Sequence, residues 1–236
     1  MKQQFVKGMR HGVPIMLGYL SVSFGFGVLC IQMNLSILAA VGISVTNLTS
    51  AGQVAGVEVI AAAGSLIEMI LCQLVINLRY SLMSLSLSQK LDPSFTLIHR
   101  LIAGYGVTDE IFAVASSQPE PLKPSYMYGL ILTPFIGWSM GTLLGAVAGD
   151  IMPTSVTAAL SLMLYGMFIA IIMPPAKKSG KVLFVILLSA GISVLLYYLL
   201  PMISAGFSVI ISALIASVAG ALFFPVSEKE RGEGQS

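Results

Sequence analysis

Long runs without a charged residue dominate the chain and predict helices that cross a lipid bilayer. A helix rises about 1.5 Å per residue and the hydrocarbon core is about 30 Å thick, so one crossing needs about 20 residues. The uncharged windows cover residues 12–57, 124–149, 151–176 and 182–227. We predict six crossings within these windows, at residues 12–32, 36–57, 126–148, 156–174, 182–200 and 203–224.

Two further apolar stretches, 69–88 and 101–118, lie in the more charged region between the first two windows. If both cross, the chain has eight membrane segments; if 101–118 enters and leaves by the same face, it has seven. The positive-inside rule places the amino terminus in the cytoplasm, because basic residues gather there: Lys2, Lys7 and Arg10. A crossing by 101–118 puts the basic loop at 177–181 on the same side, so we prefer that alternative.

The composition excludes a water-soluble protein. Hydrophobic residues make up 56% of the chain and charged residues 9%, whereas soluble domains have about 25% charged residues. The net charge of +2 provides no basic surface for nucleic acid. Cys30 and Cys72 lie in apolar runs and are interpreted as small hydrophobic residues. We therefore expect an all-helical, polytopic membrane protein with seven to eight transmembrane segments, some of them broken near the middle of the bilayer.

The Pro-rich stretch at 119–125 divides the predicted membrane segments into two halves. The expected organisation is a cytoplasmic amino-terminal tail, a first membrane half that holds a polar site, a hinge, a second membrane half and a polar cytoplasmic tail, at residues 1–11, 12–118, 119–125, 126–224 and 225–236. A faint repeat at an offset of about 119 residues pairs Gly18-Tyr19 with Gly137-Trp138. A two-fold internal repeat, common in transporters, is therefore an open alternative.

Polar residues interrupt three predicted segments near their midpoints. The first interruption is the run Thr46–Gln53, the second contains Asn77 and Arg79, and the third is Asp109-Glu110. A charge at the bilayer centre costs about 2.5–3.5 kcal/mol, so such residues pair with one another or face a wet cavity. One interpretation is an ion pair of Arg79 with either acid that only joins two helices. Three segments with polar groups at one level favour the other interpretation, a binding site.

The sequence Ser50-Ala51-Gly52 is typical of a helix that restarts after a break. A freed helix amino terminus presents N–H groups and a positive dipole end, which suit a substrate carboxylate. Gly52 together with Gly56 is equally typical of a small-xxx-small face for close helix packing. Glu58 and Glu68 flank a turn near residues 61–65, and we expect both at the membrane interface, outside the site.

Several short motifs, taken in order, resemble the AzlC family, the large subunits of branched-chain amino-acid exporters. They are Ala51-Gly52-Gln53, Asn77-Leu78-Arg79, Thr108-Asp109-Glu110 and Trp138-x-x-Gly141-Thr142-x-x-Gly145-x-x-x-Gly149. The resemblance covers residues 8–224. It implies a bacterial cytoplasmic-membrane protein that exports valine, leucine and isoleucine, with methionine as a further candidate, together with a small hydrophobic AzlD-type partner subunit. Two departures bear on the substrate: Tyr80 stands where a His is frequent, and small residues surround Ala51–Gln53.

Residues and resemblance together give a hypothesis for the site. A zwitterionic amino acid needs a cation for its carboxylate, which Arg79 and the helix restart supply, and an acid for its ammonium, which Asp109 or Glu110 supplies. The full set of candidate substrate-binding residues is Asn47, Ser50, Gly52, Gln53, Asn77, Arg79, Asp109 and Glu110. One arginine neutralises only one of the two acids, and desolvation favours protonation of the other, so proton coupling is expected.

Other function classes are less well supported by the sequence. It contains no P-loop, no histidine cluster for a metal and no nucleophile elbow, so we expect neither an enzyme nor a bound metal or cofactor. A channel needs a continuous polar path, which the later segments lack. A membrane scaffold without transport activity is the third possibility, and it predicts that the mid-segment polar residues are replaceable.

Overall fold

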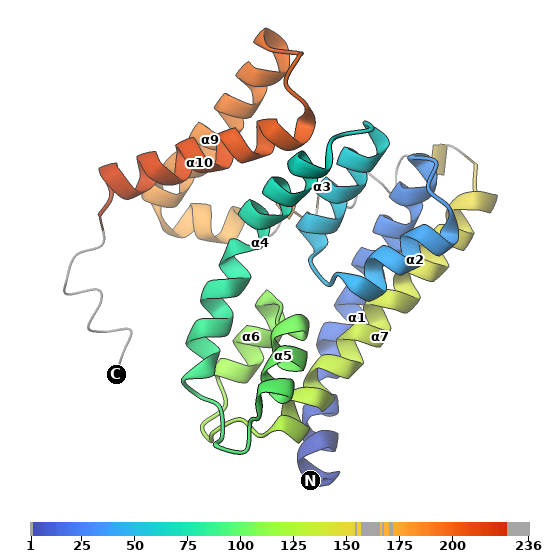
Figure 1. Ribbon diagram of the computed structural model, residues 1–236, viewed down its shortest axis with the longest axis vertical. Helices are drawn as coiled ribbons and strands as arrows, with labels where there is room; N and C mark the ends of the chain where they lie inside the picture. Colours follow the sequence, from blue (N-terminus) through green and yellow to red (C-terminus); the bar gives the residue numbers. More distant parts are fainter. Residues whose placement is uncertain (1, 154, 157–165, 167, 170–171, 226–236) are drawn as a thin grey trace. The chain divides into compact units, whose positions relative to one another are not determined.

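The computed structural model describes residues 2–153, 155–156, 166, 168–169 and 172–225, and their regular structure is helical (Figure 1). Five of these helices are long and apolar enough to cross a membrane: Lys2–Gln32, Leu66–Ser88, Pro124–Gly149, Gly180–Leu199 and Gly206–Phe223. The all-helical, multi-span class is therefore confirmed. The predicted crossing at 156–174 and the predicted tail at 225–236 lie largely outside the described residues.

Two compact units divide the chain. The first contains α1 (Lys2–Gln32), α2 (Ile37–Thr46), α5 (Leu97–Gly106), α6 (Asp109–Ser116) and α7 (Pro124–Ile151). The second contains α9 (Gly180–Leu199) and α10 (Ala205–Phe223), while α3 (Ser50–Ala61) and α4 (Leu66–Ser88) contribute residues to both units. This division does not follow the predicted hinge at 119–125, because α7 packs along α1 in the same unit.

A seam of glycines joins α1 to α7, and the two helices run parallel. Contacts advance together along both chains: Gly129 meets Phe5, Gly137 meets Met16, and Gly145 meets Phe24. A Cβ atom added at Gly145 would lie 1.9 Å from the carbonyl oxygen of Phe24. Small residues at intervals of four let two helix backbones approach closely, which explains why this sequence forms the central pair of the unit.

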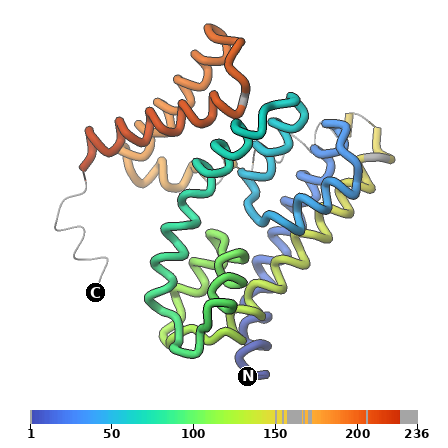
Figure 2. Tube along the Cα trace, in the orientation of Figure 1, coloured from blue at the N-terminus to red at the C-terminus, as the bar shows by residue number. Residues whose placement is uncertain are grey.

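The segment 97–116 is a hairpin that enters and leaves the unit at the same end. The backbone N–H of Asp92 donates to Leu122 at 2.9 Å, and that of Leu122 donates to Lys90 at 2.9 Å, so the chain before α5 and the chain after α6 are joined (Figure 2). This hairpin path favours the same-face alternative over the preferred prediction of a crossing by 101–118, and the number of crossings stays a prediction. The apolar run is long enough to cross, but it breaks at Val107-Thr108 and turns back.

The predicted segment 36–57 is likewise two helices. α2 ends at Thr46 and α3 begins at Ser50, so the predicted helix restart is confirmed. Neither helix, at 10 and 12 residues, reaches the roughly 20 residues that a crossing needs. α4, in contrast, continues without a backbone break through its polar residues. α1 begins at Lys2, so most of the predicted tail 1–11 belongs to the first helix.

Candidate functional site

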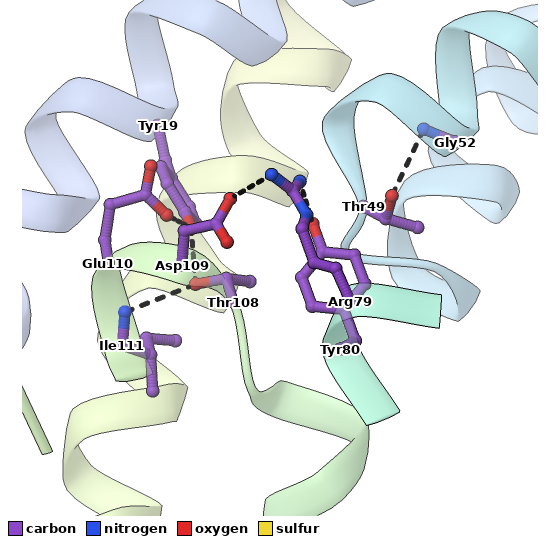
Figure 3. Close-up of polar contacts among 9 residues, drawn as sticks. All are labelled: Tyr19, Thr49, Gly52, Arg79, Tyr80, Thr108, Asp109, Glu110 and Ile111. Atoms are coloured by element: carbon purple, nitrogen blue, oxygen red, sulfur yellow. Dashed lines mark hydrogen bonds and ion pairs between the residues drawn. The ribbon is translucent and has the colours of Figure 1, made fainter. Parts of the chain in front are cut away.

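An ion pair between α4 and α6 is the centre of the candidate site. Nη1 of Arg79 lies 2.9 Å from Oδ2 of Asp109, and the two side chains are 48% and 44% exposed (Figure 3). Asp109 is the first residue of α6, where Thr108 is the N-cap and a negative charge is favoured by the helix dipole. The break before α6 therefore places the carboxylate opposite the guanidinium, and the pair stays open to a small ligand.

The second acid of this region, Glu110, is held by a residue that the sequence analysis did not select. The hydroxyl of Tyr19 lies 2.5 Å from Oε2 of Glu110 and 2.6 Å from Oγ1 of Thr108. A phenol has one proton, so the hydroxyl donates to the carboxylate and accepts from the threonine. Tyr19 thus fixes the α5–α6 break to α1. Its only sequence signal is a hydroxyl-bearing aromatic residue inside an uncharged segment, and the same residue type also serves in apolar cores.

Gln53 organises the break between α2 and α3. Its side chain is 1% exposed, its amide nitrogen donates to the backbone carbonyl oxygens of Asn47 and Ile43, and its Oε1 accepts from Nε1 of Trp138 at 3.0 Å. Carbonyl groups at a helix end lack intrahelical partners, and buried ones are costly to leave unpaired. Gln53 gives the Asn47 carbonyl a donor and gives the Ile43 carbonyl, which also accepts from the N–H of Asn47, a second one, so its amide group is used within the protein.

The other candidate residues at this break shape the start of α3. Oδ1 of Asn47 accepts from the N–H of Thr49 at 3.3 Å, and Oγ1 of Thr49 accepts from the N–H of Gly52 at 3.1 Å. Ser50 is the first residue of α3 and is half-buried. Asn47 and Gly52 therefore take part in capping the helix, which is the local reason that α3 starts here.

Both helix breaks lie beside the middle of the α1–α7 pair. Tyr19 lies near the middle of α1 and Trp138 near the middle of α7, and their rings meet edge to face at 5.2 Å between centroids. Tyr19 contacts the α5–α6 break, and Trp138 contacts the α2–α3 break. The faint repeat aligned these two residues, and they contact each other directly. Polar groups from the predicted interruptions are therefore gathered at one level of this unit.

The remaining candidate, Asn77, and the neighbouring aromatic residue Tyr80 both lie on α4. Asn77 is half-buried and, two residues before Arg79, lies on another side of the helix. Cζ of Arg79 lies 4.9 Å from the centroid of the Tyr80 ring, and Nη2 donates to the Tyr80 hydroxyl at 3.1 Å. The guanidinium is thus oriented by an aromatic face on one side and a carboxylate on the other.

Two further features concern ionisable groups in the described part of the chain. No group of three or more His, Cys, Asp or Glu residues there is arranged to hold a metal ion. Glu68, expected at the interface, is instead buried with 4% exposure. The start of α10 covers this carboxylate, a tertiary contact that local sequence does not reveal, and its position at the membrane interface stays a prediction.

Five described helices that are long and apolar enough to cross a membrane define a multi-pass membrane protein. Comparison with known proteins places it more closely: residues 14–152 match the family model described as AzlC protein. The chain belongs to the AzlC family, which confirms the resemblance noted in the sequence. No solved structure matches it.

Three relatives show how far the similarity extends. The chain is 31% identical over 214 residues to an uncharacterized membrane protein of Archaeoglobus fulgidus, covering 90% of this chain and 91% of the relative. It is 26% identical over 181 residues to inner membrane protein YgaZ of Escherichia coli, covering 74% of each chain. It is 22% identical over 183 residues to an uncharacterized membrane protein of Helicobacter pylori, covering 75% of this chain and 79% of the relative.

Proposed function

We propose that the protein is a transporter that exports branched-chain amino acids across the cytoplasmic membrane. The observation that carries the proposal is the half-exposed pair of Arg79 and Asp109 at the middle of the first unit. An arginine and an acid side by side match the carboxylate and ammonium of an amino acid. The relative YgaZ is named an inner membrane protein, which supports the choice of the cytoplasmic membrane.

Binding exchanges one ion pair for two. The guanidinium of Arg79 donates two parallel hydrogen bonds to the substrate carboxylate. The substrate ammonium donates to the carboxylate of Asp109. Because the charges of the protein pair and of the zwitterion balance, no net charge enters the site. A lone charge at this depth would be costly, so this balance permits the pair to open for the substrate.

The other candidate residues divide into two roles. Glu110 is held by Tyr19 and completes the acidic side of the site, and Ser50 at the start of α3 offers a hydrogen bond to the bound amino acid. Asn77 lies about 200° around α4 from Arg79, so its replacement acts on the site indirectly. Asn47, Gly52 and Gln53 hold the α2–α3 break in position, so their replacement acts on the site indirectly. The mechanism uses these side chains alone, as a carrier rather than an enzyme.

The family resemblance supplies the substrate class and a partner. Branched-chain amino acids combine a zwitterionic end with an apolar side chain, and a small AzlD-type membrane subunit is proposed to assemble with this chain. Proton movement is proposed as the energy source. One transport experiment, carried out with and without the small subunit, tests these proposals.

The decisive experiment is counterflow of radiolabelled leucine in proteoliposomes that contain the purified protein, alone or with its small subunit. Arg79→Ala should abolish counterflow, and Arg79→Lys should lose most of it, because an ammonium keeps the charge but not the bidentate fork. Arg100→Ala, which removes an exposed arginine of α5, is the matched control and should retain counterflow. Unchanged leucine exchange in Arg79→Ala would refute the assignment.

Two other outcomes point to the rival functions. Flux that is not saturable and needs no substrate on the opposite side would identify a channel. Replacement of Arg79 and Asp109 together by apolar residues, with no effect on the activity of the assembled complex, would identify a scaffold.

A further inference from the structure

A buried carboxylate in the second unit takes no part in the proposed substrate site. Glu68 lies in the first turn of α4 and is 4% exposed. Its Oε1 accepts from the hydroxyl of Ser204 and, at 3.1 Å, from the backbone N–H of Gly206 at the start of α10. Among the described residues, none of its interactions is an ion pair with a cationic side chain.

The Glu68 carboxylate does not make the capping bond that its local sequence predicts. Ser65-x-x-Glu68 is a capping-box pattern, in which the glutamate reaches back to the N-cap backbone. Only one half of this pattern is formed as expected, since Oγ of Ser65 accepts from the N–H of Glu68 at 3.1 Å. The carboxylate extends to α10 instead, so the interaction with α10 replaces the local cap.

Small residues enclose this carboxylate. A Cβ atom added at Gly64 would lie 2.8 Å from its Oε2, and one added at Gly206 would lie 2.5 Å from its Oε1. Two further titratable groups lie near this carboxylate, Cys72 one helical turn farther along α4 and Glu58 of α3. The surroundings of Glu68 therefore include a second acid and a thiol.

We propose that Glu68 is the binding site of the proton that drives transport. In the charged form, Glu68 accepts two hydrogen bonds and its charge faces the positive end of α10, so α10 is held on the α3–α4 turn. A proton on the carboxylate removes the charge and converts one oxygen into a donor, which weakens both bonds. Ionisable residues within membrane segments commonly serve in such proton steps.

The same helix connects this residue with the substrate site. α4 carries Glu68 in its first turn and Arg79 about 16 Å farther along, without a break between them. A shift of α4 that follows proton binding therefore acts on the arginine that holds the substrate carboxylate. This inference rests on the proposed function for the transport activity, its coupling to protons and the identity of the substrate.

The first test separates coupling from substrate binding in proteoliposomes. Glu68→Gln keeps an acceptor oxygen of the same shape but cannot titrate, so it should retain leucine counterflow and lose leucine accumulation driven by a pH gradient. Glu120→Gln, which neutralises an exposed loop acid, should keep both. Gradient-driven accumulation that survives in Glu68→Gln overturns the proposal, and so does a folded Glu68→Gln protein that has lost counterflow as well.

A second test does not depend on the transported substrate. Dicyclohexylcarbodiimide reacts with protonated carboxylic acids in apolar surroundings, and mass spectrometry locates the adduct. Wild-type protein in liposomes should be labelled at Glu68 at a rate that falls as the pH rises, and Ser204→Ala should alter this pH dependence. Absence of labelling at every pH overturns the proton site. Absence of leucine counterflow in the wild type, with labelling intact, refutes the proposed substrate and leaves the proton site standing.

Discussion

The indole nitrogen of Trp138 donates a hydrogen bond of 3.0 Å to Oε1 of Gln53, and both side chains are almost completely buried. The tryptophan belongs to the rigid α1–α7 pair, and the glutamine belongs to the α2–α3 break. A hydrogen bond between them fixes the break to the pair. Because the Trp138 ring also meets Tyr19, this contact connects the two helix breaks through one pair of aromatic residues.

Trp138→Phe removes the donor and keeps most of the ring. We expect a loss of about 1–3 kcal/mol in stability, the cost of leaving a buried acceptor unpaired. Thermal unfolding in detergent, followed by size-exclusion chromatography, measures it. Gln53→Leu should cost more, since the carbonyl group of Asn47 also loses its donor, and the double variant should cost less than the sum. Additive losses would contradict a direct interaction of the two side chains.

Tyr19→Phe removes the hydroxyl that joins Glu110 and Thr108 to α1. Each lost hydrogen bond should cost about 0.5–1.5 kcal/mol, and the less constrained acid should raise the leucine concentration needed for half-maximal counterflow. Tyr197→Phe removes a hydroxyl from a highly exposed side chain and provides the control. Equal transport kinetics in both variants would show that Tyr19 does not position the site.

Gly145→Val tests the glycine seam. A Cβ at this position would lie 1.9 Å from the backbone oxygen of Phe24, which cannot move without separating the helices. Overpacking typically lowers the free energy of unfolding by about 1–3 kcal/mol. Because Gly145 faces a backbone atom, we expect the loss in this variant to lie at or above the upper end of that range. Gly18→Ala is matched to it, because a Cβ there meets nothing within 4 Å. Measurements of expression and thermal stability should show loss for Gly145→Val and none for Gly18→Ala.

Asp92 lies in the loop between α4 and α5, outside the membrane-spanning helices, and hydrogen bonds from Ser94 lower its pKa below the ordinary value. A carboxyl whose pKa is depressed by folding stabilises the folded state above its unfolded pKa, and this contribution is lost as the pH falls through the folded value. Asp92→Ala should therefore be less stable than wild type at neutral pH. The difference in stability between the two proteins, measured from their unfolding curves, should shrink as the pH falls. A stability difference that grows in acid would contradict a lowered pKa of Asp92.

The sequence analysis predicted the helix restart at Ser50 and a polar interruption at Asp109-Glu110 because their signals are local. Ser50 and Thr108 are residues with strong preferences for helix starts, and Asp109 is favoured at a first helical position, so both breaks and the polar groups beside them follow from short-range chemistry. The sequence also predicts the membrane class directly, since long uncharged apolar runs are typical of membrane-spanning helices and not of soluble proteins.

Tertiary placement accounts for what the sequence analysis missed. The path of 97–116 depends on hydrogen bonds between Leu122 and the chain near Asp92, about thirty residues away in sequence. Glu68 is buried by the start of α10, more than a hundred residues later. Tyr19 was overlooked because its partners lie on α6. None of these contacts leaves a periodic pattern in the chain, whereas the glycine seam at intervals of four does.

The joined backbone at Leu91 and Leu122 has a topological consequence. The loops at either end of the α5–α6 hairpin are neighbours in space, so any reagent that reaches one loop from a given compartment also reaches the other. Protease sites engineered into the two loops would be cut together in one vesicle orientation and spared together in the opposite orientation.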